Sequence, residues 1–126
     1  MQGPYMEIVR KLSYKGIVFL KSVSDDNPKI DKIINKKIKY KFFYKNYKKI
    51  IDDPEIELVL ILTSMKEHSK IAIESLKKNK HVLVEKPMAT NMKDLNNLIA
   101  IAKKSKKFLL PAPFVILSPV FQAIQK

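Results

Sequence analysis

The hydrophobic pattern of this chain is dominated by two short apolar runs in its second half. Residues 58–62 read Leu-Val-Leu-Ile-Leu, and residues 82–84 read Val-Leu-Val. Continuous aliphatic runs of this length are typical of parallel strands that are covered on both faces. Because proline has no N–H to give to a ladder, Pro87 must end the second strand. Polar residues follow each run: Thr63 and Ser64 after the first, and Glu85 and Lys86 after the second.

Helical spacing of apolar residues fills much of the chain between and around these runs. Strands that alternate with helices indicate an α/β fold, with a Rossmann-like parallel sheet and helices on both of its faces. The run at residues 58–62 is expected to be a central strand, and Pro111 to break the pattern. The predicted elements are helices over residues 5–14, 28–34, 46–51, 66–78 and 91–105, with Asn27, Thr90 and Asn91 as caps, further strands over residues 17–23, 39–43 and 108–110, and a last helix that starts at Ser118 and Pro119.

The start of the chain departs from this pattern. A doubly wound sheet of this kind begins with a central strand and a glycine-rich turn, whereas here a helix opens the chain. The only glycines are Gly3 and Gly16, so no phosphate-cradling glycine motif can form. We therefore expect a sheet that lacks its first strand and glycine-rich loop and that has two unpaired strand edges.

Composition narrows the class of protein without deciding its function. At 126 residues, 46% of them hydrophobic, the chain suits one globular domain. It has no cysteine, which excludes a disulfide framework and a thiolate metal site. No apolar run approaches the roughly 20 residues of a membrane span, and residues 1–5 lack the order of a secretory signal. A cytoplasmic protein is the default expectation.

The net charge of +13 raises the alternative of a non-enzymatic protein that binds nucleic acid. Its best support is the basic, aromatic stretch over residues 38–49. All but one of the 25 basic residues are lysine, however, whereas base and phosphate recognition favours the arginine fork. The lysines are also spread over most of the chain. We interpret this stretch instead as a short strand and the start of a helix with solvated lysines.

Polar residues at the ends of the predicted strands are the candidates for chemistry, because open α/β sheets bind ligands at the carboxyl ends of their strands. Asp25 follows the first predicted strand, where it can bind a ribose diol or favour the start of the next helix. Thr63 and Ser64 supply hydroxyls, and His68 lies early in the following helix and can point back to the same edge. Taken alone, these three residues are better explained as two capping hydroxyls and one exposed helical histidine.

Glu85 and Lys86 form the sharpest candidate, since an apolar strand delivers a carboxylate and an ammonium group to that edge. The alternative is a surface ion pair at a strand end. His81 begins the same strand, so it lies at the opposite edge, and we interpret it as structural. The two histidines lie on different elements and acidic residues do not cluster around them, so no metal site is expected.

Taken together, these features resemble the Gfo/Idh/MocA family, which includes glucose-fructose oxidoreductase and inositol dehydrogenase. After Asp25, residues 53–59 are similar to the family's D-P-x-I-D-x-V approach to a strand, and residues 62–68 to its T-P-N-x-x-H motif. The strongest match is residues 80–89, which resemble K-H-V-x-x-E-K-P-x-A throughout. The similarity extends over about residues 5–126.

The resemblance implies an oxidoreductase that uses NAD or NADP to move hydride to or from a secondary alcohol or ketone of a sugar-like substrate. It implies a catalytic role for Lys86, whose ammonium group would polarise the oxygen at the carbon that exchanges hydride. It also implies a homo-oligomeric parent, because the family's second domain usually supplies the oligomer contact. The residues that it places at the cofactor are Asp25 at the adenosine ribose, Thr63, Ser64 and His68 near the nicotinamide half, and Glu85 and Lys86 at the nicotinamide ribose.

The chain also departs from the family pattern. Ser64 and Met65 stand where the family has Pro and Asn, which removes one amide contact. Residues 1–112 correspond to an incomplete cofactor domain, and residues 113–126 to the start of a second domain whose usual Asp/His pair is missing. We therefore expect a fragment of a longer enzyme that binds the dinucleotide weakly or not at all and is inactive alone. A Rossmann-like interaction module is the other alternative, and the sequence gives neither the substrate nor the choice between NAD and NADP.

Overall fold

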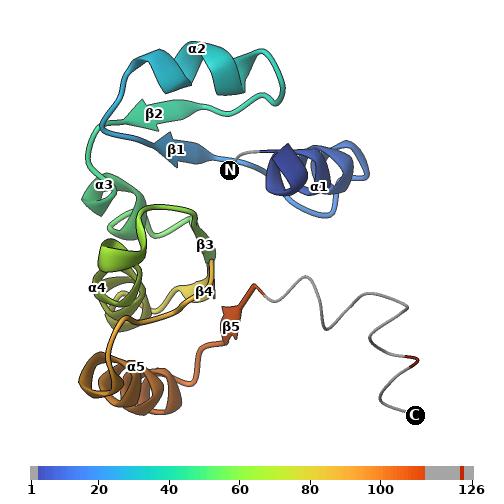
Figure 1. The fold of residues 1–126 in the computed structure, drawn as a ribbon. Helices are drawn as coiled ribbons and strands as arrows, with labels where there is room; N and C mark the ends of the chain where they lie inside the picture. The colour runs from blue at the N-terminus through green and yellow to red at the C-terminus, as the bar shows by residue number, and fades with distance from the viewer. Residues whose placement is uncertain (1–2, 113–122, 124–126) are drawn as a thin grey trace. The chain divides into compact units, whose positions relative to one another are not determined.

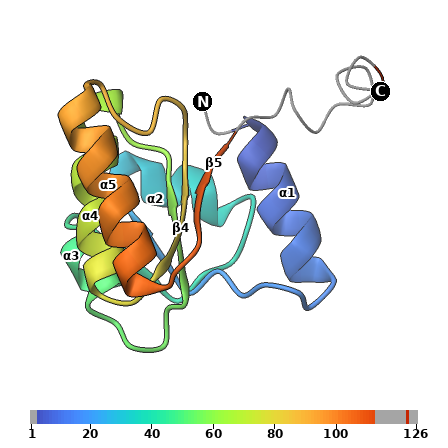
Figure 2. The same ribbon diagram turned by 90° about the horizontal axis from the view of Figure 1, so that it is seen from below.

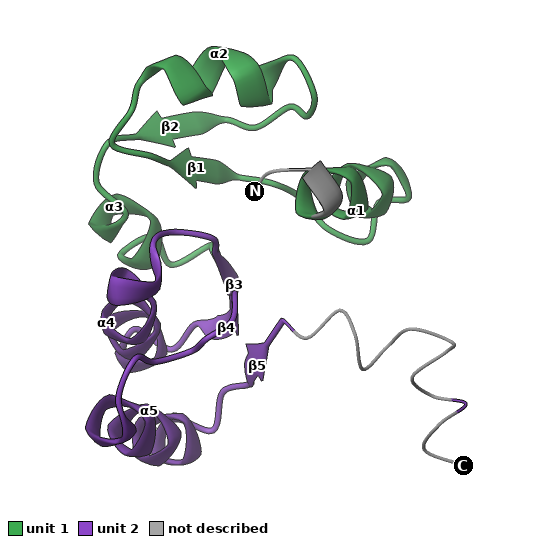
Figure 3. Cartoon of the chain, in the orientation of Figure 1, with its two compact units in different colours: residues 1–56 green, residues 57–126 purple. Residues whose placement is uncertain are grey.

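The computed structural model describes residues 3–112 and residue 123 of the chain. These residues gather in two compact units, Met1–Ile56 and Glu57–Lys126, called unit 1 and unit 2 (Figure 3). The strands of the described residues pair in parallel and alternate with helices along the chain (Figure 1). The predicted α/β class and parallel pairing are therefore confirmed.

Unit 1 is a two-stranded parallel sheet with three helices. Its elements are α1 (Gly3–Tyr14), β1 (Ser22–Ser24), α2 (Lys29–Asn35), β2 (Phe42–Tyr44) and α3 (Lys48–Ile51). Strands β1 and β2 pair with Ser22 opposite Phe42. Just before this pair, the Lys21 carbonyl accepts hydrogen bonds from the N–H groups of Lys41 (2.9 Å) and Phe42 (3.2 Å). The sheet of this unit is therefore short, with three paired positions in each strand.

The helices of unit 1 begin and end close to where the sequence predicts. Gly16 has a left-handed conformation (φ 70°) two residues after α1, which suits a residue without a Cβ at a helix end. At the start of α2, the Asn27 side chain accepts a hydrogen bond from the Lys29 N–H (3.0 Å), although the capping position itself falls on Pro28. The buried apolar residues of the unit are Tyr5, Ile34, Ile38, Ile51 and Ile56.

The basic, aromatic stretch at residues 38–49 forms β2 and the first residues of α3. Its lysines are exposed, as the interpretation of a strand and a helix with solvated lysines predicts. They are Lys39, Lys41, Lys45, Lys48 and Lys49.

In the residues that the structure describes, unit 2 has a three-stranded parallel sheet and two helices that cover part of it. Its elements are β3 (Leu58–Ile61), α4 (Met65–Lys77), β4 (His81–Val84), α5 (Met92–Ser105) and β5 (Leu109–Pro111). Strand β4 lies between β3 and β5, with Val82 opposite both Val59 and Leu109. Helices α4 and α5 lie side by side, and α4 packs against β3 and β4 (Figure 1, Figure 2).

The core of unit 2 follows from its apolar runs and from the apolar stripes of its helices. Alternate residues of β3 and β4 are buried, and α4 contributes a buried stripe at helical spacing. The apolar residues of this unit that are at most 2% exposed are Ile61, Ala72, Leu76, Val82, Val84 and Leu98. This cluster packs α4 against β3 and β4. The candidate residues of unit 2 follow the carboxyl ends of these two strands.

The predicted cap of α5 is confirmed. The Asn91 side chain accepts a hydrogen bond from the Asp94 N–H at 2.8 Å, and its amide donates to the Asp94 carboxylate at 2.8 Å. This reciprocal pair satisfies one of the free N–H groups that every helix start leaves.

Two predictions about the strands are wrong. The run at residues 17–23 forms a strand only from Ser22, and Ile17 and Phe19 are 64% and 65% exposed. An apolar run indicates burial, but a strand also needs a partner, and β2 begins opposite Ser22. The run at residues 58–62 is an edge strand, because among the described residues β3 pairs only with β4.

Pro111 is part of β5, whereas the sequence predicts that it breaks the pattern. The Ala112 N–H donates to the Val84 carbonyl (2.9 Å), so the neighbouring Pro111 nitrogen faces away from β4, where the ladder needs no N–H. The expected helix at Ser118 and the start of a second domain at residue 113 lie outside the described residues.

Candidate functional site

The carboxyl ends of β3 and β4 meet at one edge of the unit 2 sheet, as the sequence predicts. Ile61 and Val84 form the last pair of the two strands, and the Glu85 N–H continues the ladder by donating to the Ile61 carbonyl (3.0 Å). Thr63 and Lys86 each stand two residues beyond that pair, and both are exposed. Parallel pairing thus brings a hydroxyl group and an ammonium group to the same edge.

Ser64 begins α4 with a hydroxyl that the helix does not use. The residue occupies the capping position in an extended conformation (φ −69°, ψ 148°), but its side chain makes no capping hydrogen bond. Only its carbonyl takes part, by accepting a hydrogen bond from the Glu67 N–H at 2.9 Å. The exposed hydroxyl therefore stands at the positive end of the helix, where it can meet an anionic or hydroxylated ligand.

His68 is buried, with 1% of its surface exposed, so its interpretation as an exposed helical histidine is wrong. Its Nδ1 atom lies 2.8 Å from the Pro87 carbonyl oxygen, and its Nε2 atom lies 3.0 Å from the Thr63 carbonyl oxygen. The ring points back to the strand edge, as predicted, and there it joins the loop after β4 to the turn after β3. Because both nitrogens face the backbone, His68 acts on that edge through the backbone.

Glu85 and Lys86 are neighbours that differ in exposure. Glu85 is buried, with 9% exposed, and its carboxylate accepts a hydrogen bond from the Lys86 N–H at 3.0 Å. The Lys86 side chain is exposed, and its ammonium group makes no ion pair with the described residues. The peptide bond between Lys86 and Pro87 is cis. The carboxylate thus holds the backbone of Lys86, and the ammonium group is left to meet a ligand.

Asp25 stands at the carboxyl end of β1 in unit 1, where the sequence places it. Its N–H donates to the Tyr44 carbonyl (3.1 Å), and its carboxylate accepts a hydrogen bond from the Asn27 N–H (2.8 Å). The carboxylate therefore shapes the turn before α2. The other candidates all belong to unit 2.

Two polar clusters in unit 1 have no counterpart among the residues predicted from the sequence. The Lys21 ammonium group binds the carboxylates of Asp53 (2.6 Å) and Glu55, and these two hydrogen bonds raise the pKa of Lys21. The Tyr40 hydroxyl donates to the carboxylate and to the carbonyl (2.9 Å) of Asp31; burial, and then this hydrogen bond, raise the pKa of Tyr40 to about 12. Lys21 and Glu55 are 34 positions apart, so no local pattern signals their contact.

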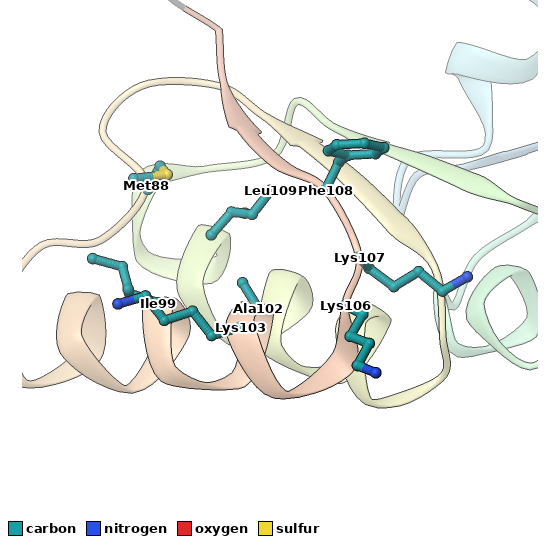
Figure 4. A pocket seen from close by; sticks show the side chains of 8 residues that line it. All are labelled: Met88, Ile99, Ala102, Lys103, Lys106, Lys107, Phe108 and Leu109. Atoms are coloured by element: carbon teal, nitrogen blue, oxygen red, sulfur yellow. The ribbon is translucent and has the colours of Figure 1, made fainter.

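A shallow hollow of about 480 Å³ lies between α5 and β5, and none of the candidate residues lines it. Figure 4 shows the apolar side chains of Met88, Ile99 and Leu109 around it, with the ammonium groups of Lys106 and Lys107 directed away from Leu109. The hollow is therefore apolar and separate from the strand edge that carries the candidate site.

The described residues contain neither a cluster of metal ligands nor a membrane-spanning helix. In residues 3–112 and 123, no group of three or more His, Asp or Glu side chains stands close enough together to hold a metal ion. The helices of this described part also lack the length and apolar character of a membrane span.

Comparison with known proteins identifies the family of this chain. Residues 9–112 match the oxidoreductase family with an NAD-binding Rossmann fold that is designated GFO_IDH_MocA. The myo-inositol 2-dehydrogenase of Thermotoga maritima is 36% identical over 66 residues, which cover 52% of this chain and 20% of that protein. The chain thus spans about a fifth of the length of this curated relative.

Solved structures agree with this match. A probable dehydrogenase from Thermotoga maritima superimposes with a TM-score of 0.84 at 26% identity, over 96% of this chain and 36% of that chain. Biliverdin reductase from Synechocystis, in complex with biliverdin and NADP⁺, superimposes with a TM-score of 0.82 at 28% identity, over 96% of this chain and 39% of that chain. The chain belongs to the Gfo/Idh/MocA family of oxidoreductases, and its residues 9–112 correspond to the family's NAD-binding Rossmann-fold domain.

Proposed function

We propose that this chain is the cofactor-binding part of an NAD(P)-dependent oxidoreductase that acts on a secondary alcohol or ketone of a sugar-like substrate. One observation carries the proposal: paired strands of unit 2 end in an exposed hydroxyl and an unpaired, exposed ammonium group at one edge. In a parallel α/β sheet, that edge is where ligands bind. The family match supports the same reading, since it describes an NAD-binding domain.

The residues at the strand ends fit a dinucleotide. The hydroxyls of Thr63 and Ser64 are exposed, and the Ser64 hydroxyl is not used as a helix cap. A carboxylate at the end of β1, that of Asp25, suits the hydroxyls of a ribose. We assign Thr63, Ser64, His68, Glu85 and Lys86 to the nicotinamide half and Asp25 to the adenosine ribose. When bound, the nicotinamide ring supplies or takes up the hydride.

Lys86 is the residue that we assign to the reacting oxygen of the substrate. Its ammonium group can hold a proton against the oxygen whose charge grows as the carbon–hydrogen bond forms or breaks. The buried Glu85 carboxylate fixes the backbone of Lys86 through the 3.0 Å hydrogen bond, so the side chain starts from a defined position. His68 contributes by holding the Pro87 carbonyl, one residue further along the chain.

A named relative supports a substrate class. The Thermotoga maritima relative is named for myo-inositol, a ring that carries secondary alcohols. We therefore propose a polyhydroxylated small molecule as the substrate. The proposal also includes residues 1–112 as the cofactor domain, residues from 113 onward as the start of a substrate domain, a homo-oligomeric enzyme, and a cytoplasmic setting, in which a chain without cysteine has no disulfide to maintain.

The first test is binding of the cofactor by the chain itself. We expect the ¹⁵N-labelled chain, titrated with NADH or NADPH and followed by NMR, to show saturable shifts at the amides of Ser64 and Lys86 only at concentrations well above micromolar. The described residues contain no glycine-rich turn to donate N–H groups to the pyrophosphate, so affinity is weak. Sub-micromolar binding would overturn the expected weakness, and saturable shifts confined to other segments would overturn the assigned site.

The second test is the role of Lys86. In a hybrid enzyme in which residues 9–112 replace the corresponding segment of the Thermotoga maritima myo-inositol 2-dehydrogenase, we expect Lys86→Ala to lower kcat by about 10²-fold or more. Binding of NADH should change little, because the lost group acts on the substrate oxygen. Lys77→Ala, an exposed lysine in the last turn of α4, is the matched control. Unchanged turnover in Lys86→Ala removes this residue from its assigned role.

A further inference from the structure

The two histidines of the chain face opposite kinds of backbone group. Both ring nitrogens of His68 face carbonyl oxygens, those of Pro87 at 2.8 Å and Thr63 at 3.0 Å. In contrast, Nδ1 of His81 receives the Phe108 N–H at 3.1 Å. The first ring is almost fully buried, whereas the second is partly exposed and stacks on the Phe108 ring, with centroids 5.2 Å apart.

These partners decide where hydrogen must sit on each ring. A carbonyl oxygen only accepts hydrogen bonds, and a backbone N–H only donates them. A neutral imidazole has one N–H and one bare nitrogen, so it can satisfy only one of the two carbonyls that face His68. The ring with hydrogen on both nitrogens satisfies both. His81 requires the reverse, a bare Nδ1, which leaves its hydrogen on Nε2.

Because His68 is buried, both the charged and the neutral form of its ring carry a free-energy cost. A cation in a dry site is costly, and the first turns of a helix disfavour positive charge. A neutral ring in the same site would turn a nitrogen lone pair towards a carbonyl oxygen with no water to separate them. The buried Glu85 carboxylate, two residues before Pro87, adds negative charge to this edge. The charged residues nearest to His68 along α4 are Lys66, Glu67 and Lys70. Glu85 and Lys86 follow β4, Lys93 and Asp94 lie in the first turn of α5, and β3 has no charged residue.

We infer that His68 is a positioning residue that carries hydrogen on both ring nitrogens at neutral pH and, in this form, joins the Thr63 carbonyl to the Pro87 carbonyl. Loss of one hydrogen would cut one of the two ties. Only one of the two segments, either the turn that carries Ser64 or the loop that carries Lys86, would then be hydrogen-bonded to the ring. The value of this clamp to catalysis rests on the proposed function, whereas its protonation does not.

The protonation state can be read directly by NMR. In the ¹⁵N-histidine-labelled chain, long-range ¹H–¹⁵N correlations show two rings, and His81→Gln assigns them by removing one. At neutral pH we expect two hydrogen-bearing nitrogens in His68, and a bare Nδ1 with a hydrogen-bearing Nε2 in His81. One bare and one hydrogen-bearing nitrogen in His68 at neutral pH would overturn the inference.

A second measurement tests whether the ring positions the two backbone segments. Over a pH series, any change in the ring shifts of His68 should be followed by the amide shifts of Ser64 and Met88 in the same sample. This coupled response should persist in His81→Gln and vanish in His68→Phe, which keeps a ring but has no donor. If the amide shifts in the unaltered chain do not change together with the His68 ring shifts, the clamp is rejected, even where His68→Phe fails to fold. No cofactor enters either measurement, so failure of NADH binding and failure of the clamp are separate outcomes.

Discussion

Unit 1 and unit 2 repeat one strand–helix pattern but stabilise it by different means. In unit 2, β3 and β4 are aliphatic strands with alternate residues buried, and α4 covers them with a buried stripe that includes Ala72 and Leu76. In unit 1, the strands are three residues long, β1 contains two serines, and Phe42 of β2 is 45% exposed. Unit 1 adds polar ties between side chains: Tyr40 to Asp31, and Lys21 to Asp53 and Glu55.

This difference shows which stabilising interactions can be predicted from a local sequence pattern. Apolar burial is proportional to area and needs no exact partner, so a run of aliphatic residues reports it directly. Polar ties depend on the geometry of two particular groups, and their net contribution is smaller because water competes for both. We therefore expect unit 2 to respond most strongly to loss of apolar volume, and unit 1 to loss of hydrogen bonds.

The largest effect is expected from Leu76→Ala in unit 2. Leu76 is fully buried (0% exposed), so the change removes buried methyl groups and leaves a cavity, at a cost of about 2 to 5 kcal/mol of unfolding free energy. Urea unfolding followed by NMR measures this for each unit separately. Ile99→Ala on α5, at 38% exposed, is the matched control and should cost far less. Equal losses in both units would break the comparison, since they would then unfold as one.

An intermediate effect is expected from Tyr40→Phe in unit 1, which removes the hydrogen bond to Asp31 and costs about 1.5 kcal/mol. The pKa of Tyr40 is raised to about 12 in the fold, so its stabilisation is present below the ordinary tyrosine value and is lost as the pH rises through about 12. In Tyr40→Phe, the part of the alkaline loss of stability of unit 1 that is due to Tyr40 should disappear, and the part due to Lys21, whose pKa is also raised, should remain. Tyr14→Phe, at 94% exposed, should leave both the stability and its alkaline loss as they are.

The smallest effect is expected from Asn91→Ala, which removes the α5 cap and costs about 1 kcal/mol. The loss should appear first as faster hydrogen exchange at the amides of the first turn of α5, including Asp94. Asn96→Ala, at an exposed position within α5, should be neutral or slightly stabilising, because alanine is the better helix former. A similar loss in both variants would mean that helix propensity, and not the cap, decides the outcome.

Much of unit 2 could be predicted from the sequence. The strands β3 and β4, the helices α4 and α5, and the cap at Asn91 all follow from apolar runs, helical spacing and cap chemistry. Their common edge follows from parallel pairing, so the convergence of Thr63 and Lys86 is confirmed.

What could not be predicted depends on partners that are distant in the sequence. The strand at residues 17–23 shrank to β1 because its partner begins only at Phe42. The burial of His68 and its bonds to the Thr63 and Pro87 carbonyls also need two separate turns to meet. The helical spacing shows on which face of the helix a histidine lies, but not which other segment covers that face. The roles of the site residues at the cofactor stay predictions.

The proline in β5 limits pairing of this strand with another copy of the chain. Pro111 directs a nitrogen without hydrogen to the outer side of β5, so this rim offers one donor fewer to an arriving strand. The other rim of the same sheet, along β3, has no such guard within the described residues, and Leu58 there is 51% exposed. Self-association of the isolated chain should therefore use one edge of this sheet: copies should pair through β3 and not through β5.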